Sequence, residues 1–459
     1  MTAEAATGDK NKFQALFEQA LALQRSGDTA KAEALYRKLL TYFPDHTPSL
    51  INLGVILKNA GYYDAAVAVY TRAYTLDATS ISVLGNLGNV LLLSGRFDEA
   101  LACHEQVLKT KPDSPEAYFN KGLTLRAMGR LQQATFCFDR ALALRTDYAE
   151  AEWDRSLTML MNNELQEGFA AYEARWKLPH VDRPALPGQG WTGSDPAGKR
   201  ILIYAEQGFG DTLQFIRYGQ LLKQKRATVI AYVQNELVDV LKGCAFLDEV
   251  YGYKDTIPGF DAHAPLMSLP FLMGTTSATI PSPVPYLAVP AAEPFEFLKR
   301  PKNEIKVGIC WAGKPTHKND RNRTIGLAPF LKLLSVPRTA LFSLQVSDRQ
   351  ADIAEYGADG LLYNLAPHIK SFVDTAQILQ QLDLVITVDT SLAHLAGAMG
   401  RPVWLVLPMV GDWRWLQHGE KTPWYPSMQL FRQTEFGTWD NVFDDVVQHL
   451  DKLASSRAV

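Results

Sequence analysis

The stretch LVITVDTSLAHLAGAMGRPVWLVLP, residues 384–408, has the local order strand, turn, helix, strand. Two apolar runs of strand length enclose a turn that opens with Asp389, Thr390 and Ser391, and His394 follows one helical turn later. A Gly-Arg-Pro turn then leads into the second run. Short apolar runs that alternate with a helical pattern predict a βαβ unit in a parallel sheet.

The turn at residues 389–394 predicts an anion site. Backbone N–H groups point outward at a helix start, and the helix dipole favours negative charge there. Thr390 and Ser391 can donate to a phosphate, whereas Asp389 is expected to accept hydroxyl hydrogens or to cap the turn. A lone histidine is more often structural than a ligand, but beside these donors we expect His394 to contact phosphate or sugar.

The same alternation begins at residue 200. Strands are expected at residues 200–206, 227–234, 305–311, 340–344, 384–388 and 403–407, with a turn at 207–211 and helices at 212–225 and 236–243. A Pro-rich stretch, 280–294, separates the two halves. The pattern predicts two Rossmann-like, doubly wound α/β domains, 200–300 and 301–459, the second ending in a helix. Ligands of such sheets bind at the carboxyl ends of the strands.

The turn after the first strand, EQGFGD, contains Gln207, Gly208, Gly210 and Asp211. Its glycines allow a tight turn, and Asp211 stands at the start of the next helix; the simpler interpretation is a glycine turn with an Asp cap. Leu213 replaces the third glycine of the dinucleotide fingerprint GxGxxG. We therefore expect no nicotinamide or flavin cofactor.

A basic loop follows the strand at residues 305–311. The sequence WAGKPTHKNDRNRT, residues 311–324, contains Lys314, His317, Lys318, Arg321 and Arg323. Such cations at a strand end suit a phosphate, since an arginine can bind two of its oxygens at once. The alternative, a solvated surface loop, is disfavoured because the adjoining Trp-Ala-Gly suggests close backbone approach and Asp320 could orient one arginine.

Composition excludes several classes of protein. The 459 residues are 47% hydrophobic, and 46 basic against 49 acidic residues give a net charge of -3, which offers no general attraction for nucleic acid or an anionic membrane. The four cysteines contain no CxxC pair, so neither a zinc cluster nor a disulfide framework is expected. No window approaches a membrane span, and the sequence predicts a soluble cytoplasmic protein.

The first part of the chain repeats every 34 residues. The positions that keep this period are Gly27, Gly61, Gly95 and Gly129; Ala32, Ala66, Ala100 and Ala134; and Tyr36, Tyr70, His104 and Phe138. Small residues where two helices cross, a glycine at the bend and an aromatic side chain that packs on the next pair predict an α-solenoid. The pattern matches the tetratricopeptide (TPR) repeat.

The register fades after residue 147. Gly168 and Tyr172 keep the phase, but Asn163 replaces the bend glycine, so we expect a degenerate fifth repeat that caps the array. The predicted repeat domain is 1–178, followed by a Pro- and Gly-rich linker at 179–199. A solenoid groove suits an extended client protein; the alternative is that the repeats mediate only self-association.

The stretch DTSLAHLAGAMGRPVW resembles the signature of glycosyltransferase family 9, the heptosyltransferase group, and the GxGD turn is similar to that family's amino-terminal motif. The resemblance spans about residues 190–450. It implies a GT-B fold whose second domain holds a nucleotide-sugar donor. It also implies that Asp211 is the general base, that Arg323 contacts donor phosphate, and that Asp389, Thr390, Ser391 and His394 form the donor turn.

Two features depart from the heptosyltransferases. One is the repeat array, and the other is residues 411–433, which are rich in Trp and Arg. The combination is similar to bacterial TPR-linked glycosyltransferases, including those that modify flagellin. We expect Trp413, Arg414, Trp415 and Trp424 to stack on the donor base or to wall the acceptor side, with aromatic packing under a carboxyl-terminal helix as the alternative.

The expected reaction needs no metal, because no DxD pair stands beside the presumed donor site. Helix-terminal N–H groups with Arg321 or Arg323 would stabilise the leaving phosphate, and Asp211 would deprotonate a Ser, Thr or glycan hydroxyl, with inversion at the anomeric carbon. The alternatives are a heptosyltransferase-like enzyme that acts on a saccharide or lipid-linked glycan, and a catalytically inactive TPR scaffold.

Overall fold

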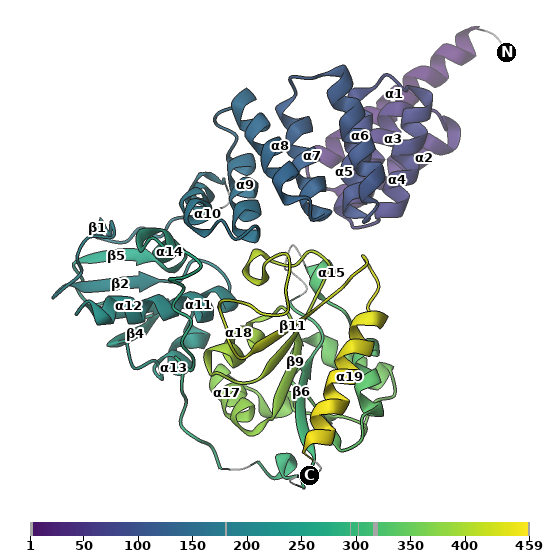
Figure 1. Cartoon of the computed structure of the whole chain (residues 1–459). Coiled ribbons are helices and arrows are strands. Elements are labelled where there is room, and N and C mark those ends of the chain that lie inside the picture. The colour runs from purple at the N-terminus through teal and green to yellow at the C-terminus, as the bar shows by residue number, and fades with distance from the viewer. Residues whose placement is uncertain (1–2, 180, 294, 302, 315–319, 458–459) are drawn as a thin grey trace. The chain divides into compact units, whose positions relative to one another are not determined.

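The computed structural model describes residues 3–179, 181–293, 295–301, 303–314 and 320–457. The chain divides into two compact units, Met1–Arg155 and Ser156–Val459. The first unit is helical, and the second contains two parallel sheets (Figure 1). The predicted fold class, an α-solenoid followed by α/β domains, is confirmed.

Successive helices pair with one another in the first unit (Figure 1). The helices are α1 (Ala3–Arg25), α2 (Thr29–Tyr42), α3 (Thr47–Asn59), α4 (Tyr63–Leu76), α5 (Ile81–Leu93), α6 (Phe97–Thr110), α7 (Pro115–Ala127) and α8 (Leu131–Leu144), followed by α9 (Ala149–Met161). The division between the units falls inside α9, earlier than the predicted domain boundary at residue 178.

Each bend between paired helices needs a left-handed backbone conformation. The φ angles are +87° at Gly27, +83° at Gly61, +82° at Gly95 and +74° at Gly129. Asn163, where the glycine is replaced, also has a positive φ of 63°. Asparagine adopts this region more readily than most side chains do, so the fifth bend keeps the geometry without the glycine.

The periodic aromatic residues fill gaps left by a second set of periodic glycines. A Cβ atom on Gly54 would lie 2.6 Å from Tyr70 Cζ, and one on Gly122 would lie 2.7 Å from Phe138 Cε1. Each pair belongs to one repeat, so the aromatic ring packs first within its own helix pair. The sequence assigned it only to the next pair.

The second unit begins with helices that precede its sheets. These are the end of α9, then α10 (Leu165–Tyr172) and the 3-10 helix η1 (Glu173–Lys177). The first sheet, sheet A, contains β1 (Gln189–Gly190), β2 (Arg200–Tyr204), β3 (Thr228–Val233), β4 (Glu249–Gly252) and β5 (Ala262–Pro265). Its helices are α11 (Phe209–Phe215), η2 (Ile216–Tyr218), α12 (Gly219–Gln224), η3 (Asn235–Leu237), α13 (Val238–Leu241), η4 (Leu266–Ser268) and α14 (Leu269–Leu272).

Sheet A is parallel, with strand order β1-β5-β2-β3-β4. The order reverses direction between β2 and β5, which makes this the topological switch point of the sheet. Two expectations are corrected. The predicted linker at 179–199 contributes strand β1, and the predicted helix at 212–225 is interrupted by η2 and begins earlier, at Phe209.

The second sheet, sheet B, has the order β11-β10-β9-β6-β7-β8, also parallel. Its strands are β6 (Ile305–Cys310), β7 (Thr339–Ser343), β8 (Tyr363–Asn364), β9 (Leu384–Val388), β10 (Val403–Leu407) and β11 (Met428–Arg432). Its helices are η5 (Glu296–Leu298), α15 (Asp320–Arg323), η6 (Ala328–Ser335), η7 (Asp348–Ala351), α16 (Asp352–Glu355), η8 (Ala366–His368), α17 (Phe372–Gln381), α18 (Ser391–Ala398), η9 (Trp413–Trp415) and α19 (Asp440–Ser456). The switch point lies between β6 and β9.

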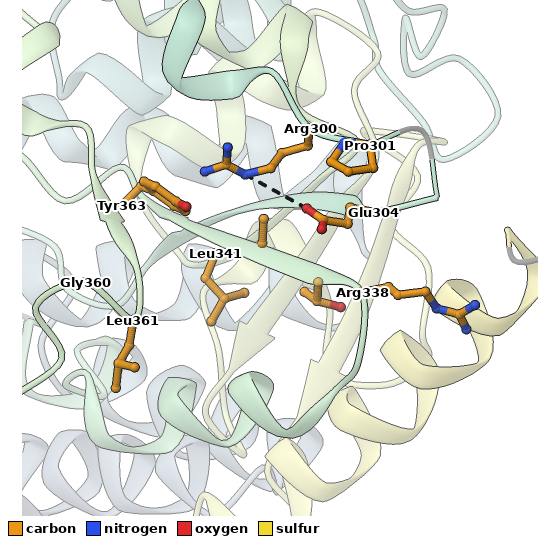
Figure 2. Close-up of a pocket in the computed structure, with 10 residues that line it drawn as sticks. Arg300, Pro301, Glu304, Arg338, Leu341, Gly360, Leu361 and Tyr363 are labelled. Carbon is orange, nitrogen blue, oxygen red and sulfur yellow. Dashed lines mark ion pairs between the residues drawn. The ribbon is translucent and has the colours of Figure 1, made fainter.

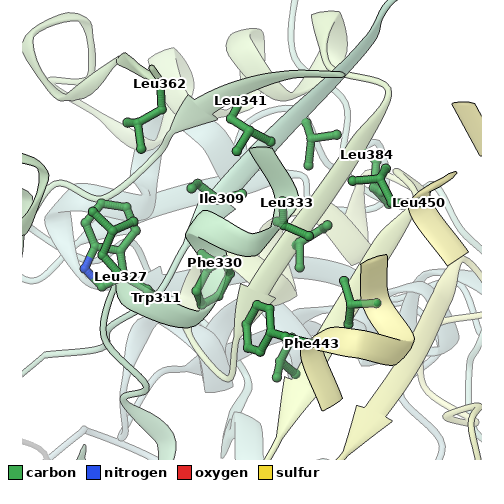
Figure 3. Close-up of a cluster of buried hydrophobic side chains, with 14 of the residues drawn as sticks. Ile309, Trp311, Leu327, Phe330, Leu333, Leu341, Leu362, Leu384, Phe443 and Leu450 are labelled. Atoms are coloured by element: carbon green, nitrogen blue, oxygen red, sulfur yellow. The ribbon is translucent and has the colours of Figure 1, made fainter. Parts of the chain in front are cut away.

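A cluster of apolar side chains joins sheet B to the helices on one face (Figure 3). Ile309 and Leu384 of the sheet, Phe330 of η6, and Phe443 and Leu450 of α19 belong to this cluster. Burying one such side chain stabilises the fold by roughly 1.5–3 kcal/mol. The core therefore holds the strands whose carboxyl ends bear the predicted donor turns.

None of the helices in the described residues is both long enough and apolar enough to cross a membrane.

Candidate active site

The two predicted motif turns meet in the second unit. Helix α11, which follows β2 of sheet A, packs on α18, which follows β9 of sheet B. At the contact Gly210 faces the imidazole of His394, so closely that a Cβ atom on Gly210 would lie 2.8 Å from His394 Cδ2. The glycine is thus required by the close approach between α11 and α18.

Asp211 lies in the first turn of α11 and is held on both carboxylate oxygens. Oδ2 accepts the backbone N–H of Gly208 at 2.9 Å, which satisfies an orphan donor at the helix start. Oδ1 accepts a hydrogen bond from Arg414 Nη2. The side chain keeps 22% exposure, so the carboxylate reaches solvent while its direction is fixed.

Arg414 reaches Asp211 from the loop that follows β10. Its other guanidinium nitrogens donate to Asp412 Oδ1 at 2.8 Å and to Gln214 Oε1 at 2.9 Å. The guanidinium carbon lies 4.3 Å from the centroid of the Trp413 ring. Burial lowers the pKa of Arg414, but the carboxylates of Asp412 and Asp211 outweigh this and raise it, so the cation is retained. Arg414 ties the two domains together at the candidate base.

The donor turn opens α18. Thr390 occupies the N-cap position but makes no side-chain cap to the helix, so the first N–H groups of α18 receive no side-chain acceptor from it. Its hydroxyl lies 3.4 Å from that of Thr387. Thr390 and Ser391 are partly exposed. This is a helix start of the kind that binds anions.

The carboxyl group of Asp389 stands beside this helix start. Burial raises the pKa of Asp389 to about 6, and the charge of Asp412 adds to the shift. The guanidinium groups of Arg414 and Arg323 act in the opposite direction. The side chain is 19% exposed.

His394 is enclosed by protein. The residue is 4% exposed, Nδ1 lies 2.9 Å from the hydroxyl of Tyr425, and the ring stacks on Trp415 with centroids 5.2 Å apart. Burial lowers the pKa of His394 well below its usual range, so the imidazole is neutral at physiological pH. Nε2 lies 3.9 Å from Asp389 Oδ1. In this arrangement His394 packs inside the protein next to the donor turn. Direct contact between His394 and a donor stays a prediction.

Arg323 is positioned by the turn that follows β6. Its Nε donates to Asp320 Oδ1 at 3.4 Å, and Nη1 donates to the carbonyl oxygen of Asp389 at 3.3 Å. The guanidinium lies against Gly313, where a Cβ atom would be 2.6 Å from Nη2. The pairing with Asp320 that the sequence suggested is present, and the group that closely approaches the Gly313 backbone is the guanidinium of Arg323 itself. Arg323 therefore joins the two turns on either side of the switch point of sheet B.

The other predicted cations are less defined. Lys314 is exposed. Arg321 lies in α15, but its side chain, like residues His317 and Lys318, lies outside the described part of the structure. Their contribution to phosphate binding stays a prediction.

For Trp413 and Trp424 the structure favours aromatic packing, the second of the two predicted roles. Trp413 is 3% exposed and Trp424 is fully buried, and their ring centroids lie 6.2 Å apart. Phe169 of α10 and Phe215 of α11 complete the cluster edge-on. Rings with so little exposed surface have no free face for a donor base, so these tryptophans act as packing between elements. They pack against Phe169 and Tyr172 of α10 and Phe215 of α11.

Gln207 and Gly208 lead into the base turn. The side-chain amide of Gln207 donates to the hydroxyl of Tyr172 at 3.0 Å. The backbone carbonyl oxygen of Gln207 accepts a hydrogen bond from Gln234 Nε2 at 2.7 Å. Gly208 is exposed and forms the N-cap of α11. These contacts hold the turn; the sequence-based expectation that Gln207, Gly208 and Gly210 lie on the acceptor or donor-base side stays a prediction.

A cavity of about 480 Å³ lies elsewhere, at the amino ends of β6 and β7 (Figure 2). The guanidinium of Arg300 lies over the Tyr363 ring at 4.2 Å and 3.9 Å from Glu304 Oε2. Ligands of parallel sheets bind at the carboxyl ends, so this cavity is not part of the candidate site.

Among the described residues, no group of three or more His, Cys, Asp or Glu side chains could hold a metal ion. The metal-free reaction stays a prediction, made because the sequence has no DxD pair beside the presumed donor site.

Sequence reasoning missed several residues of the site. Gln214 and Asp412 orient Arg414, and Tyr425 encloses His394 together with Trp415, which the sequence had named only for donor-base stacking or the acceptor side. Asp412, next to an aromatic and basic run, gave a weak local signal. The others lie in an apolar helix or an aromatic loop, and only tertiary contact distinguishes them.

Family models match three stretches of the chain. Residues 17–81 and 79–147 match tetratricopeptide repeat models, and residues 338–406 match the glycosyltransferase family 9 (heptosyltransferase) model. The family 9 match includes the turn at Asp389 but not the turn at Asp211.

Protein FlbA of Caulobacter vibrioides is 27% identical over 322 residues, which are 63% of this chain and 53% of FlbA. The match thus spans about half the length of that relative. Among solved structures, MamA from Desulfovibrio magneticus RS-1 is 20% identical and covers 36% of this chain and 92% of its own, with a TM-score of 0.33. PilF of Pseudomonas aeruginosa is 20% identical and covers 36% of this chain and 77% of its own, with a TM-score of 0.32.

Proposed function

We propose that this protein, a TPR-containing family 9-like glycosyltransferase, moves a sugar from a nucleotide-sugar donor to a hydroxyl group of a protein that the repeats recruit. The transfer proceeds without a metal ion and inverts the anomeric centre. Flagellin, through Ser or Thr hydroxyls, is the candidate acceptor suggested by the resemblance to TPR-linked enzymes. The proposed location is the cytoplasm.

One observation carries the proposal. The packing of α11 on α18 brings the Asp211 turn of sheet A to the Asp389 turn of sheet B. Both turns follow the carboxyl ends of strands beside a switch point, where ligands of α/β sheets bind. A carboxylate and an anion-binding helix start are the two groups that a sugar transfer between them requires.

In this mechanism the donor phosphates bind at the start of α18. The first N–H groups of the helix, the hydroxyls of Thr390 and Ser391 and the guanidinium of Arg323 face the phosphate oxygens. These donors stabilise the charge that develops on the leaving nucleoside diphosphate, and they need little reorganisation because Asp320 and the Asp389 carbonyl already hold Arg323.

Asp211 then acts as the general base. The acceptor oxygen forms a bond to the anomeric carbon while the bond from that carbon to the phosphate oxygen breaks. The hydroxyl proton passes to the Asp211 carboxylate, and the nucleoside diphosphate leaves with the electron pair. Arg414 and the Gly208 N–H fix the direction of the carboxylate throughout.

The first test is isothermal titration of the full-length protein with ADP, UDP, GDP, CMP and their sugar forms. Binding of one nucleotide is the expected result, and Arg323→Met should weaken it. A chain that binds none of them would be the inactive scaffold instead.

The second test addresses the base. Because a general base contributes about 100- to 10,000-fold, Asp211→Asn should lower turnover within that range while nucleotide binding is retained. Asp255→Asn is a matched control, since Asp255 Oδ2 accepts the N–H of Gly252 at 2.7 Å in the same local geometry but in a turn after β4. Equal turnover in Asp211→Asn and the wild type would exclude the assignment.

The acceptor is tested by intact mass. Flagellin co-expressed with the wild type should gain the mass of one or more sugars, and flagellin co-expressed with Asp211→Asn should not. If the mass stays unchanged while donor turnover persists on a saccharide or lipid-linked glycan, the acceptor is a glycan.

A further inference from the structure

The switch point of sheet A is bridged by the chain's own upstream segment. Arg175 of η1 lies between the residues that follow β2 and those that follow β5. Its Nη2 donates to Ser268 Oγ at 2.7 Å and lies 2.7 Å from Glu206 Oε1. In an open α/β sheet this is the position where a ligand is expected. Here a guanidinium group links the two strand ends.

The bridge is buried and charged. Arg175 is 1% exposed, and the side chain of Glu206 is 4% exposed. A second carboxylate, Glu173, lies 2.6 Å from Arg175 Nη1 and accepts from Ser268 Oγ at 2.8 Å. Removing one member of a buried ionic cluster leaves the others unpaired, which is costly. The geometry around Glu206 thus depends on Arg175.

Glu206 leads directly into the base turn, and the rest of that turn is held from the same side. Tyr172, the last residue of α10, exchanges hydrogen bonds with the Gln207 side chain at 3.0 and 3.3 Å. Gln234 then links the Gln207 carbonyl oxygen to the hydroxyl of Thr212, the residue after Asp211. The turn is fixed at both ends.

We propose that Arg175 is a positioning residue for sugar transfer, which holds the strand end at Glu206 so that Asp211 keeps its direction. This inference rests on the proposed function. Arg175 does not contact the reacting groups. It acts through Glu206 and the turn that follows, and the segment Leu165–Lys177 thereby serves as part of the transferase unit as well as the end of the helical region.

Glu206 Oε2 supports this dependence. It is buried and has no hydrogen-bond partner among the described residues, so Arg175 is the cation that stabilises the carboxylate. A lysine at position 175 could pair with Glu206 but could not also reach Glu173 and Ser268 with a planar fork. The arginine is therefore expected to be only partly replaceable.

The experiment compares full-length Arg175→Met and Arg175→Lys with Arg183→Met, an exposed arginine on the neighbouring stretch that lies over Trp176. We measure amide hydrogen exchange of the peptide 204–213, and kcat and KM for the nucleotide-sugar identified by titration. Arg175→Met should exchange at least about tenfold faster in that peptide, and kcat should fall about 10- to 100-fold while donor KM changes less than about twofold. Arg175→Lys should recover part of kcat, and Arg183→Met should match the wild type.

Several results would overturn the inference: wild-type exchange at 204–213 in Arg175→Met, an unchanged kcat, or a lysine variant no better than methionine. If wild-type protein turns over no donor, the proposed function fails first, and that outcome is separate. Should Arg175→Met not fold, Tyr172→Phe removes the hydroxyl that bonds to the Gln207 side chain. Amide hydrogen exchange in the peptide 204–213 should then be faster than in the wild type, but by a smaller factor than in Arg175→Met. An unchanged exchange rate would count against the proposal.

Discussion

The carboxyl group of Glu206 makes stability depend on pH at the scale of one residue. Burial raises the pKa of Glu206 to about 7; Arg175 opposes the shift, and Glu173 and Asp211 add to it. The folded pKa therefore lies above the ordinary value of 4.5. The folded state binds the proton more tightly, so this contribution to stability is complete below pH 4.5 and is lost as the pH rises through about 7.

Glu206→Gln should remove that loss. The wild type loses stability as the pH rises from 5 to 8, and the variant should not. The difference in free energy of unfolding, variant minus wild type, should therefore grow by up to about 3 kcal/mol over this range. Denaturant unfolding at several pH values measures the difference. Glu249→Gln is the control, because hydrogen bonds from Tyr251 and Arg200 lower the pKa of Glu249 and no such rise is expected. A difference that stays constant over this range would contradict the prediction.

The single residue Gly210 lies at the contact between α11 of sheet A and α18 of sheet B. Gly210→Ala would place Cβ 2.8 Å from His394 Cδ2, and the imidazole cannot retreat because Trp415 and Tyr425 enclose it. We expect α11 and α18 to separate and donor turnover to fall by at least about tenfold, since small misplacement of reacting groups is costly. Gly259→Ala, which meets nothing within 4 Å in the same domain, should behave as the wild type. Normal turnover in Gly210→Ala would show that the contact is not needed.

At the scale of the helix pair, His104 occupies the aromatic position of its repeat but brings a polar atom into the core. It packs against Gly88 as Tyr70 packs against Gly54, and a Cβ on Gly88 would lie 2.6 Å from His104 Cε1. Its Nε2 is buried without a partner among the described residues. Burial, with a smaller effect of Lys121, lowers the pKa of His104 to about 4.

His104→Phe should therefore stabilise the repeats by about 1–2 kcal/mol, because an unsatisfied polar atom leaves the core. The folded pKa lies below the ordinary 6.5, so wild-type stability declines as the pH falls from 6.5 towards 4, and the variant should lack this decline. Thermal unfolding at pH 5 and pH 7.5 tests both effects. Phe138→His, the reverse change at the equivalent position, should destabilise the repeats. If it stabilises them, the polar atom of His104 is not the cause of the predicted loss.

How much of each element the sequence could predict depends on local periodicity. The 34-residue period gave the repeat bends, even at Asn163, because helix pairing is encoded within each repeat. Strands β9 and β10 were predicted with their observed bounds, because they are continuous apolar runs. β8 has two residues, and β11 contains Gln429 and Arg432, so neither gave a strand pattern. The break at η2 interrupts an apolar run that locally resembles one helix.

The candidate site shows the same limit. Each motif turn was visible locally because glycine or small polar residues follow a strand. The pairing of Asp211 with Arg414 joins residues about 200 positions apart, and only the folded chain selects it. For Trp413 and Trp424 the sequence left ligand contact and aromatic packing open, because composition cannot distinguish a binding wall from a buried cluster; the structure buries both rings.

In the whole molecule, Arg217 joins the parts of the second unit. It is fully buried, and its nitrogens donate to the carbonyl oxygens of Gln214 and Trp424 at 2.8 and 2.6 Å and to the Tyr286 hydroxyl at 2.9 Å. Among the described residues it has no carboxylate partner within ion-pair distance. These contacts connect the end of α11, the segment between the two sheets and the loop before β11.

The two compact units should unfold as separate cooperative transitions, since each has its own core. Arg217→Met leaves several buried acceptors unpaired, at a cost of about 1–3 kcal/mol for each, and should lower only the transition of the second unit. His104→Phe should raise only that of the first. Scanning calorimetry, with hydrogen exchange to assign each transition, measures both shifts. A single transition that moves in both variants would mean that the chain folds as one cooperative unit, and the repeats would then bear directly on the stability of the transferase.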